Sequence, residues 1–385
     1  MSDEKVYNDD QKIEELLTRR IGSFEGRSNI WPSKEEAKKK LKENKGLRIY
    51  LGIDPTGSDL HLGHVVPLLF LKQLLELGHI PVLVIGDFTA RIGDPSGKDT
   101  TRKPLAEEEI KNNFNGYLGQ VYKILPESSI EIMYNSSWLD RLTIKDFFQL
   151  ASQVTVQQMI QRSMFQERIE KDKPFAVHEF LYPLMQGYDS VAMNIDGEVG
   201  GIDQMFNMRM GRDLMKKLLG KEKLVFGTRL VEDPITGKKM SKSGGEVIAI
   251  NDEPSEIRRK ILALGDSMTK IIFELCTDES LDRISDKEKA LSGREYKELL
   301  AGKLIEMFRG KEKIKEAQAP KEGKATGNLA VTIKDLGFAS SISEAKKLIT
   351  SNAVEINGQV KTDWNYQLQK GDKLKVGKGR FGLII

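Results

Sequence analysis

The sequence predicts an α/β protein in which a parallel sheet comes first, an α-helical region second and a small α+β unit last. Residues 47–53 are predicted as a strand, residues 63–77 as a helix that ends at Gly78, and residues 80–86 as a strand buried on both faces. Strand, helix and strand in this order form a βαβ unit, which closes right-handed into a Rossmann-like parallel sheet. Ligands of such sheets bind at the carboxyl ends of the strands.

The segments on either side of this unit are predicted mainly as helices. The spacing of Ile13, Leu16 and Leu17 predicts an N-terminal surface helix. Residues 105–170 have a mostly helical pattern, and a further helix is expected from Pro183, because proline is tolerated in the first helical turn.

The C-terminal third changes character twice. Residues 246–250 are predicted as a short strand, after which the chain is charged and helical from 253 to about 310. Residues 311–328 are rich in Lys, Glu, Ala, Gly and Pro and lack aromatic residues, which predicts a linker. A compact unit is expected from 329 to 385.

Composition limits the possible classes of function. With 385 residues, two or three domains are expected, and 39% hydrophobic and 30% charged residues are typical of a soluble globular protein. A net charge of +3 requires that any nucleic acid be bound by a local excess of positive charge. The single cysteine, Cys276, excludes a disulfide within the chain, and no metal-ligating set is predicted. No segment approaches a membrane span and the N-terminus is polar, so we expect a cytoplasmic location.

Two glycine-rich segments resemble phosphate loops but do not meet their requirements. Gly377, Gly379 and Gly382 spell GxGxxG, yet too few residues follow for a helix, so a turn between terminal strands is expected. The segment GDPSGK at 93–98 has one residue too few between its glycines for a Walker motif. It could still present Lys98 and backbone donors to a phosphate.

The motif HLGH, residues 61–64, lies where the loop at 54–60 meets its helix. A helix N-terminus carries partial positive charge and free amide donors, so it attracts phosphate. His61 and His64 face the same side and can donate to phosphate oxygens, and Gly63 lets a flat base approach the backbone. The alternative for these four residues alone is an ordinary helix cap.

The motif KMSKS occupies residues 239–243 and is followed by two glycines, which suits a loop that closes over a ligand. Lys239 and Lys242 could clamp a triphosphate while charge moves to the departing pyrophosphate. An exposed basic loop is the alternative. Both motifs together, in this order and about 180 residues apart, are far more specific than either.

These motifs resemble the two signatures of class I aminoacyl-tRNA synthetases. Between them, Tyr182, Gln186 and Asp189 are spaced i, i+4, i+7, so they share one helical face that is polar where a core helix would be apolar. That segment, the stretch GGIDQ at 200–204 and Tyr50 in IYLGIDPTG resemble the bacterial tyrosyl-tRNA synthetases. The resemblance extends over essentially the whole chain.

The resemblance implies a tyrosine-binding set. Tyr50 and Asp189 would bind the hydroxyl group of the substrate. The ammonium group and the carboxylate would be bound by Tyr182, Gln186, Asp94 and Gln204.

It also implies an ATP-binding set. The adenosine and backbone region would lie against Gly52, Asp54, Gly63, Gly201, Asp203 and Met240. Thr56 and His61 would stabilise the leaving phosphates, and His64 would support the nucleotide. The pyrophosphate would be neutralised by Lys98, Arg102, Lys239 and Lys242. ATP would enter as a substrate with Mg²⁺, and catalysis would consist of positioning and charge stabilisation.

The C-terminal unit resembles an S4-type RNA-binding domain. Its sequence SISEAKKLITSNAVEINGQ predicts a lysine-bearing helix and then a strand ending at the Asn357-Gly358 turn. From residue 329 onward nine Lys or Arg face five Asp or Glu. The residues that could reach RNA phosphates are Lys346, Lys347, Lys361, Lys375, Lys378 and Arg380.

The resemblance divides the chain into five segments. We expect a catalytic domain at 1–235, the KMSKS loop and a linker at 236–252, a helical tRNA-binding domain at 253–320, a second linker at 321–328 and the S4-like domain at 329–385. The expected partners are tyrosine, ATP, tRNA(Tyr) and a second copy of the chain. The apolar-rich stretch IKDFFQLASQVTVQQMI supports a homodimer, although core packing would also explain it.

Three other functions remain open at this stage. Tryptophanyl-tRNA synthetases share the fold and both signatures, but Tyr50, Asp189 and the S4-like tail argue against them. A nucleotidyltransferase with an HxGH motif would leave residues 253–385 unexplained. A non-catalytic RNA-binding protein with a synthetase-like body would not need both motifs intact.

Overall fold

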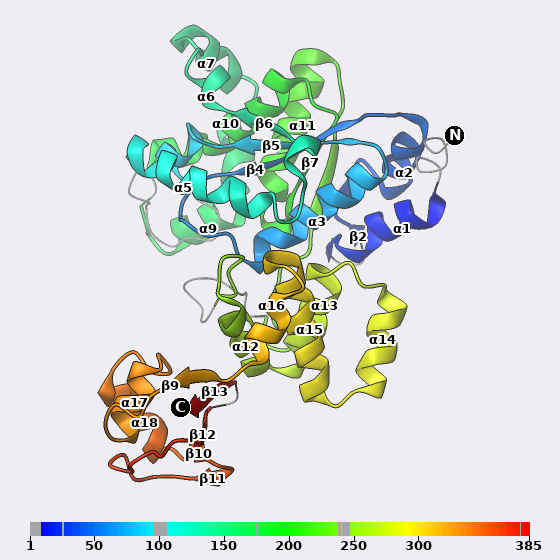
Figure 1. Ribbon diagram of the computed structural model, residues 1–385. Helices are drawn as coiled ribbons and strands as arrows, with labels where there is room; N and C mark the ends of the chain where they lie inside the picture. The colour runs from blue at the N-terminus through cyan, green and yellow to red at the C-terminus, as the bar shows by residue number, and fades with distance from the viewer. Residues whose placement is uncertain are drawn as a thin grey trace. The chain divides into compact units, whose positions relative to one another are not determined.

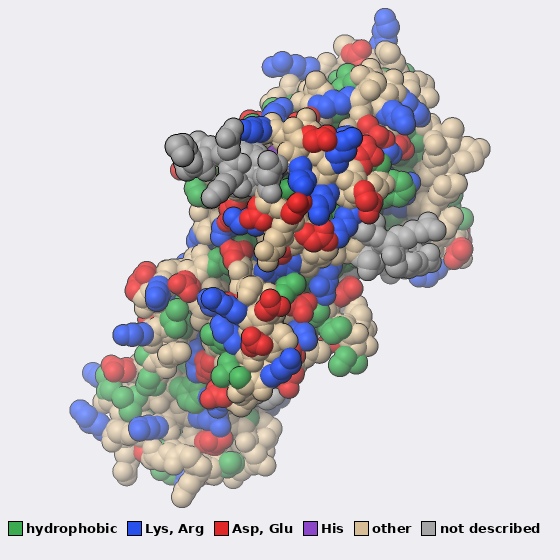
Figure 2. Space-filling model, turned by 90° about the vertical axis from the view of Figure 1, so that its right-hand side faces the viewer, with side chains coloured by type: hydrophobic (Ala, Val, Ile, Leu, Met, Phe, Trp, Pro, Cys, Tyr) green, Lys and Arg blue, Asp and Glu red, His purple; other side chains and the backbone are tan. Residues whose placement is uncertain are grey.

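Figure 1 shows the chain as a computed structural model that describes residues 9–24, 27–94, 106–174, 176–237, 240, 247–377 and 379–385. The chain forms two compact units. The first comprises Met1–Asp233, Gly237–Asn251 and Glu274–Asp278, and the second comprises Pro234–Thr236, Asp252–Phe273 and Glu279–Ile385. On the face drawn in Figure 2, Lys and Arg side chains are interspersed with Asp and Glu, as the small net charge implies.

The centre of the first unit is a six-stranded sheet in the order β3-β8-β7-β4-β5-β6. Its strands are β3 (Ile30–Trp31), β4 (Arg48–Ile53), β5 (Ile80–Ile85), β6 (Glu131–Tyr134), β7 (Gly197–Gly201) and β8 (Leu224–Thr228). All neighbours run parallel except β3 and β8. Helix α3 (Leu62–Glu76) connects β4 to β5, which confirms the predicted α/β fold class. The strand order reverses direction at β4, and this switch point is where such sheets bind ligands.

The first unit also contains a short antiparallel pair, β1 (Ser23–Phe24) and β2 (Arg27–Ser28). Its other helices are α1 (Asp10–Arg19), α2 (Lys34–Glu43), α4 (Thr89–Ile92), α5 (Glu107–Val121), α6 (Ser136–Leu139), α7 (Ile144–Ala151), α8 (Val156–Ile160), α9 (Ser163–Glu170), α10 (Val177–Met193) and α11 (Met205–Leu219). Helices α10 and α11 pack closely. The distance is so short that a methyl group on Gly187 would lie 3.3 Å from the Cα atom of Gly211. Among the described helices, none is long and apolar enough to cross a membrane.

Three predictions for the first unit need correction. Helix α10 begins at Val177, not at Pro183, because Glu179 accepts a bond from the backbone amide of Ala176 at 2.9 Å and starts the helix earlier. The mostly helical stretch at 105–170 also contains strand β6. The strand predicted at 246–250 is reduced, over its described residues, to one isolated bridge between Ala249 and His61.

The second unit combines helices with a five-stranded sheet in the order β11-β10-β12-β13-β9. Its helices are α12 (Pro254–Ala263), α13 (Asp266–Cys276), whose end from Glu274 belongs to the first unit, α14 (Leu281–Ala290), α15 (Gly293–Arg309), α16 (Lys313–Gln318), α17 (Leu329–Asp335) and α18 (Ile342–Thr350). The strands are β9 (Lys321–Gly323), β10 (Val354–Ile356), β11 (Gln359–Val360), β12 (Lys373–Val376) and β13 (Arg380–Ile384). The turn predicted at Asn357-Gly358 joins β10 to β11, and the glycine-rich turn joins β12 to β13.

The segment predicted as a linker is structured. It contains α16 and then β9, which pairs in parallel with β13, the last strand of the chain. The apolar core beneath this sheet includes Leu329, Ile349, Val354 and Ile384. Strand β9 is therefore part of the C-terminal sheet, although its sequence, KEG, carries no apolar residue.

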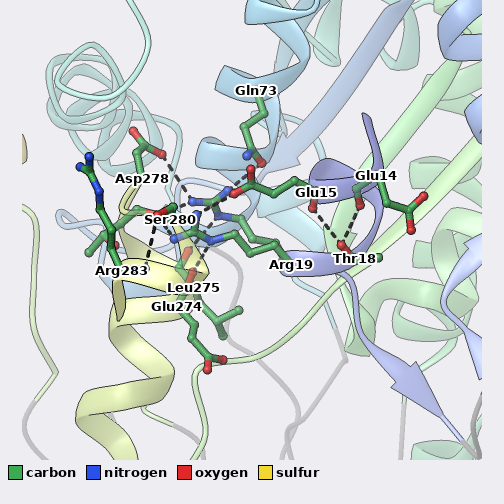
Figure 3. A network of polar contacts seen from close by, with 12 residues as sticks. Glu14, Glu15, Thr18, Arg19, Gln73, Glu274, Leu275, Asp278, Ser280 and Arg283 are labelled. Carbon is green, nitrogen blue, oxygen red and sulfur yellow. Dashed lines mark hydrogen bonds and ion pairs between the residues drawn. The ribbon is translucent and has the colours of Figure 1, made fainter. Parts of the chain in front are cut away.

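Two arginines near the end of α1 fix the segment Glu274–Asp278 within the first unit (Figure 3). Arg19 and Arg20 are almost fully buried, and both donate to the carbonyl oxygen of Thr277, at 2.8 and 2.6 Å. Arg20 also donates to Gln73 of α3 at 2.6 Å. Burial lowers the pKa of Arg20 to about 10. The carbonyl groups at the C-terminal end of α13 carry partial negative charge and attract cations. The bonds of the two arginines connect three segments of the unit: the end of α1, helix α3 and Glu274–Asp278.

Candidate active site

A cavity of about 390 Å³ opens at the carboxyl ends of β4, β5 and β7, next to the first turn of α3. It brings together most of the residues predicted from the sequence. Those that line it are Gly52, Asp54, Thr56, His61, Gly63, His64, Asp94, Tyr182, Gln186, Asp189, Gly201, Asp203, Gln204 and Met240. Four further predicted residues, Lys98, Arg102, Lys239 and Lys242, lie outside the described residues.

The two histidines of the HLGH motif cap α3 and line the cavity at the same time. His61 is the N-cap residue, and its Nδ1 accepts from the backbone amide of Gly63 at 3.1 Å. His64 Nδ1 accepts from the backbone amide of His61 at 3.2 Å. A ring nitrogen that accepts carries no proton, so in each neutral imidazole the proton is on Nε2, which is then a donor. A methyl group on Gly63 would lie 2.9 Å from the His61 ring, so a larger residue at this position would displace that ring.

Asp189 of α10 is the buried acceptor of the cavity. Its carboxylate is 4% exposed and accepts from the indole Nε1 of Trp138 at 2.7 Å and from Asn135 Nδ2 at 3.4 Å. Burial raises the pKa of Asp189 well above its ordinary value, although the two hydrogen bonds act to lower it. The sequence analysis missed Trp138 and Asn135, because they follow β6, the strand that was not predicted.

A second carboxylate, Asp54, lies at the end of β4. It accepts from the hydroxyl of Tyr182 at 2.8 Å and from Thr89 Oγ1 at 2.7 Å. Burial raises the pKa of Tyr182 well above its ordinary value, and the neighbouring Asp54 raises it further. A methyl group on Gly86 would lie 1.9 Å from Asp54, so a glycine at the end of β5 is needed for this carboxylate to fit.

A chain of polar side chains runs along another wall of the cavity. Gln204 donates to Asp94 at 2.7 Å, and Asn207 donates to Gln204 at 2.9 Å and to Gln186 at 2.8 Å. Gln186 then donates to Glu198 at 3.2 Å. Three residues predicted to bind the amino acid are thus joined through Asn207, which the sequence analysis did not identify.

Tyr50 is the described residue of the predicted set that does not line the cavity. Its side chain is fully buried, and its hydroxyl lies 3.0 Å from Ser190 Oγ. Burial raises its pKa well above the ordinary value, and the carboxylates of Glu198 and Asp189 raise it further. The phenol is therefore close to the buried acceptors, and its contact with a substrate stays a prediction.

The predicted RNA-binding residues differ in how freely they can reach a phosphate. Lys346 and Lys347 of α18 are exposed, and Lys361 lies 4.9 Å from the centre of the Tyr366 ring. Lys375 bonds Glu355 at 2.6 Å, and Arg380 donates to the carbonyl oxygen of Phe338 at 2.6 Å. Lys378 lies outside the described residues.

No group of three or more His, Cys, Asp or Glu is arranged to hold a metal ion within the described ranges. The lone cysteine is structural. Cys276 is buried with its sulfur 3.6 Å from the carbonyl oxygen of Leu62, and burial raises its pKa to about 12.

Comparison with known families identifies two matches in this chain. Residues 42–320 match the family of class I tRNA synthetases (W and Y), and residues 328–374 match the S4 domain. The chain belongs to this family of class I aminoacyl-tRNA synthetases, as the HLGH and KMSKS motifs predicted.

The names of the curated relatives state the amino acid on which those proteins act. A tyrosine--tRNA ligase from Carboxydothermus hydrogenoformans is 39% identical over 381 residues, which cover 91% of this chain and 93% of that protein. One from Thermotoga maritima is 39% identical over 372 residues, with the same coverage. The mitochondrial tyrosyl-tRNA synthetase of Aspergillus nidulans has the same fold, with a TM-score of 0.67 at 19% identity over 80% of this chain and 92% of that one.

Proposed function

We propose that this chain, a tyrosine--tRNA ligase, forms tyrosyl-adenylate in the cavity of the first unit and transfers the tyrosyl group to tRNA(Tyr). The observation that carries the proposal is that one cavity holds both the HLGH turn of α3 and the buried acceptor Asp189. In the first step a tyrosine carboxylate oxygen attacks the α-phosphorus of ATP, and pyrophosphate leaves with the electrons of the broken bond. In the second step a ribose hydroxyl at the 3′ end of tRNA attacks the acyl carbon, and AMP leaves.

The two ends of the cavity suit the two substrates. His61 and His64 would donate to the phosphates through Nε2 at the positive end of α3, and the lysines of KMSKS would neutralise the pyrophosphate. Mg²⁺ would enter with ATP as its counter-ion. Asp189 would accept the phenolic hydrogen of tyrosine. An indole offers a donor at a different position, so this acceptor favours tyrosine over tryptophan.

The remaining expectations concern assembly and location. We include a homodimer, because α7 and the start of α8 leave large apolar side chains in solvent: Ile144 is 78%, Phe148 68% and Val156 58% exposed. Side chains of this kind, close together in the sequence, are typical of an interface. The S4-like segment would hold the tRNA, and the enzyme would work in the cytoplasm, where its tRNA substrate is found.

Amino-acid-dependent ATP–pyrophosphate exchange tests the proposal. Tyrosine should support exchange, and phenylalanine should be rejected by roughly 10⁴ to 10⁵, the range known for sites that bind a substrate hydroxyl, of which tyrosyl-tRNA synthetases are themselves the example. His61→Ala should slow exchange by roughly 10² to 10³ with little change in tyrosine affinity, since His61 acts on charge that develops in the transition state. Comparable exchange with phenylalanine or tryptophan would refute the assignment.

A further inference from the structure

A fully buried ion pair lies next to the tyrosine-binding side chains, and the reaction steps above do not use it. Lys223, immediately before β8, and Glu198 of β7 form a salt bridge with side-chain exposures of 0% and 2%. The Lys223 ammonium also donates to Ser190 Oγ at 2.6 Å and lies 5.4 Å from the centre of the Tyr50 ring. Burial of a charge is costly unless the charge is paired and hydrogen-bonded, so each group restricts where the other can lie.

One side of this pair orients Gln186. A carboxylate in a salt bridge is an acceptor only, and Gln186 Nε2 donates to Glu198 Oε1 at 3.2 Å. The amide oxygen of Gln186 must then point the other way, where Asn207 donates to it at 2.8 Å. Reversing the amide would place oxygen against oxygen at Glu198. Glu198 thus determines that Gln186 offers an oxygen, the kind of atom that an ammonium group needs.

The other side of the pair orients Tyr50. An ammonium group has three hydrogens and no acceptor, so in the bond to Lys223 the oxygen of Ser190 accepts. The hydroxyl hydrogen of Ser190 is then directed to another acceptor, and the phenolic oxygen of Tyr50 lies 3.0 Å away. When Ser190 donates in this bond, the hydrogen of Tyr50 is left for a further acceptor. Glu198, which also bonds Tyr50, and the phenolic oxygen of a bound tyrosine are such acceptors.

We propose that Lys223 is a positioning residue for the amino acid, which acts through Glu198 on Gln186 and through Ser190 on Tyr50. The inference rests on the proposed function, because it assigns both targets to tyrosine. The ion pair would therefore affect tyrosine binding and the rejection of phenylalanine. It would leave ATP binding unchanged, because Lys223 and Ser190 do not border the cavity, and Glu198, which does, bonds Gln186 and Lys223 and not a residue predicted to bind ATP.

The double variant Lys223→Met/Glu198→Gln tests this role, because it removes both buried charges together and keeps side chains of similar length. In tyrosine-dependent ATP–pyrophosphate exchange, its KM for tyrosine should rise about tenfold or more, the effect expected for lost bonds to charged groups. Its KM for ATP should stay within about twofold and its melting temperature near that of the wild type. Lys221→Met is the matched control, because Lys221 pairs with Asp196 at 2.7 Å and is 34% exposed.

Two results would overturn the proposal: a folded double variant with an unchanged KM for tyrosine, or equal rises in the KM for tyrosine and for ATP. Ser190→Ala, which breaks only the connection to Tyr50, gives an independent measurement if the double variant does not fold. It should lower the preference for tyrosine over phenylalanine about tenfold, and an unchanged preference would contradict the role of Lys223 toward Tyr50. A wild type without tyrosine-dependent exchange would refute the proposed function itself. A wild type that exchanges and a double variant that matches it would refute only the role of Lys223.

Discussion

Removal of three lysines from the S4-like segment should change how tRNA binding depends on salt. Of the six residues predicted to contact RNA, Lys346 and Lys347 are exposed and Lys361 is half-buried against Tyr366, whereas Lys375 and Arg380 are bonded to other protein groups. Each phosphate contact contributes about 0.7 to 0.9 to the slope of log affinity against log salt. Three contacts therefore contribute a slope of about 2 to 3.

The triple alanine variant at these positions should bind tRNA with a flatter salt dependence than the wild type. Between 50 and 200 mM salt, the wild type should lose roughly 20- to 40-fold more affinity than the variant. A filter-binding titration at four salt concentrations would measure both slopes. The control replaces three other exposed lysines of the same segment, Lys334, Lys370 and Lys373, so the change in net charge is identical. Equal slopes for the two triple variants would contradict the assignment of Lys346, Lys347 and Lys361 as phosphate contacts.

Three more predictions concern the cavity, the assembly and the second unit. Trp138→Phe should raise the KM for tyrosine about tenfold, because it removes the 2.7 Å donor to Asp189, and an unchanged KM would exclude this support. Phe148→Asp should turn a dimer into a monomer in light scattering, whereas a monomeric wild type would refute the homodimer. The bond from Lys303 lowers the pKa of Glu279 to about 2, so its stabilisation is complete above pH 4.5 and is lost as the pH falls toward 2. Thermal unfolding of Glu279→Gln should show a smaller loss of stability over that range than the wild type.

The sequence was sufficient for the features that depend on neighbouring residues. The unit from β4 to β5 was predicted closely, because a continuous apolar strand and a long apolar helix leave few alternatives. Most cavity residues were assigned through the resemblance to the synthetase family, whose motifs lie at the ends of β4 and β7 and on one face of α10. Helical spacing alone placed Tyr182, Gln186 and Asp189 together.

Features that depend on contacts between distant segments were missed. Strand β6 has only four residues and was not predicted. The placement of Asn135 and Trp138 beside Asp189 depends on the pairing of β6 with β5, which the sequence does not reveal. Glu198 and Lys223 stand in the polar contexts DGEVGG and KEKLVF, which in a sequence are typical of solvated surface. Their burial comes from the pairing of β7 with β8, which places Glu198 opposite Val225.

The pairing of β9 with β13 has a consequence for biosynthesis. About 60 residues separate these strands, and a ribosome adds about 5 to 20 residues per second. Roughly 3 to 12 s therefore pass between the synthesis of β9 and the synthesis of β13. A nascent chain that stalls before Arg380 exposes one edge of β12 and leaves β9 without its neighbour, and open edges of this kind favour pairing with other chains. The codons for β13 thus determine whether the C-terminal sheet can close.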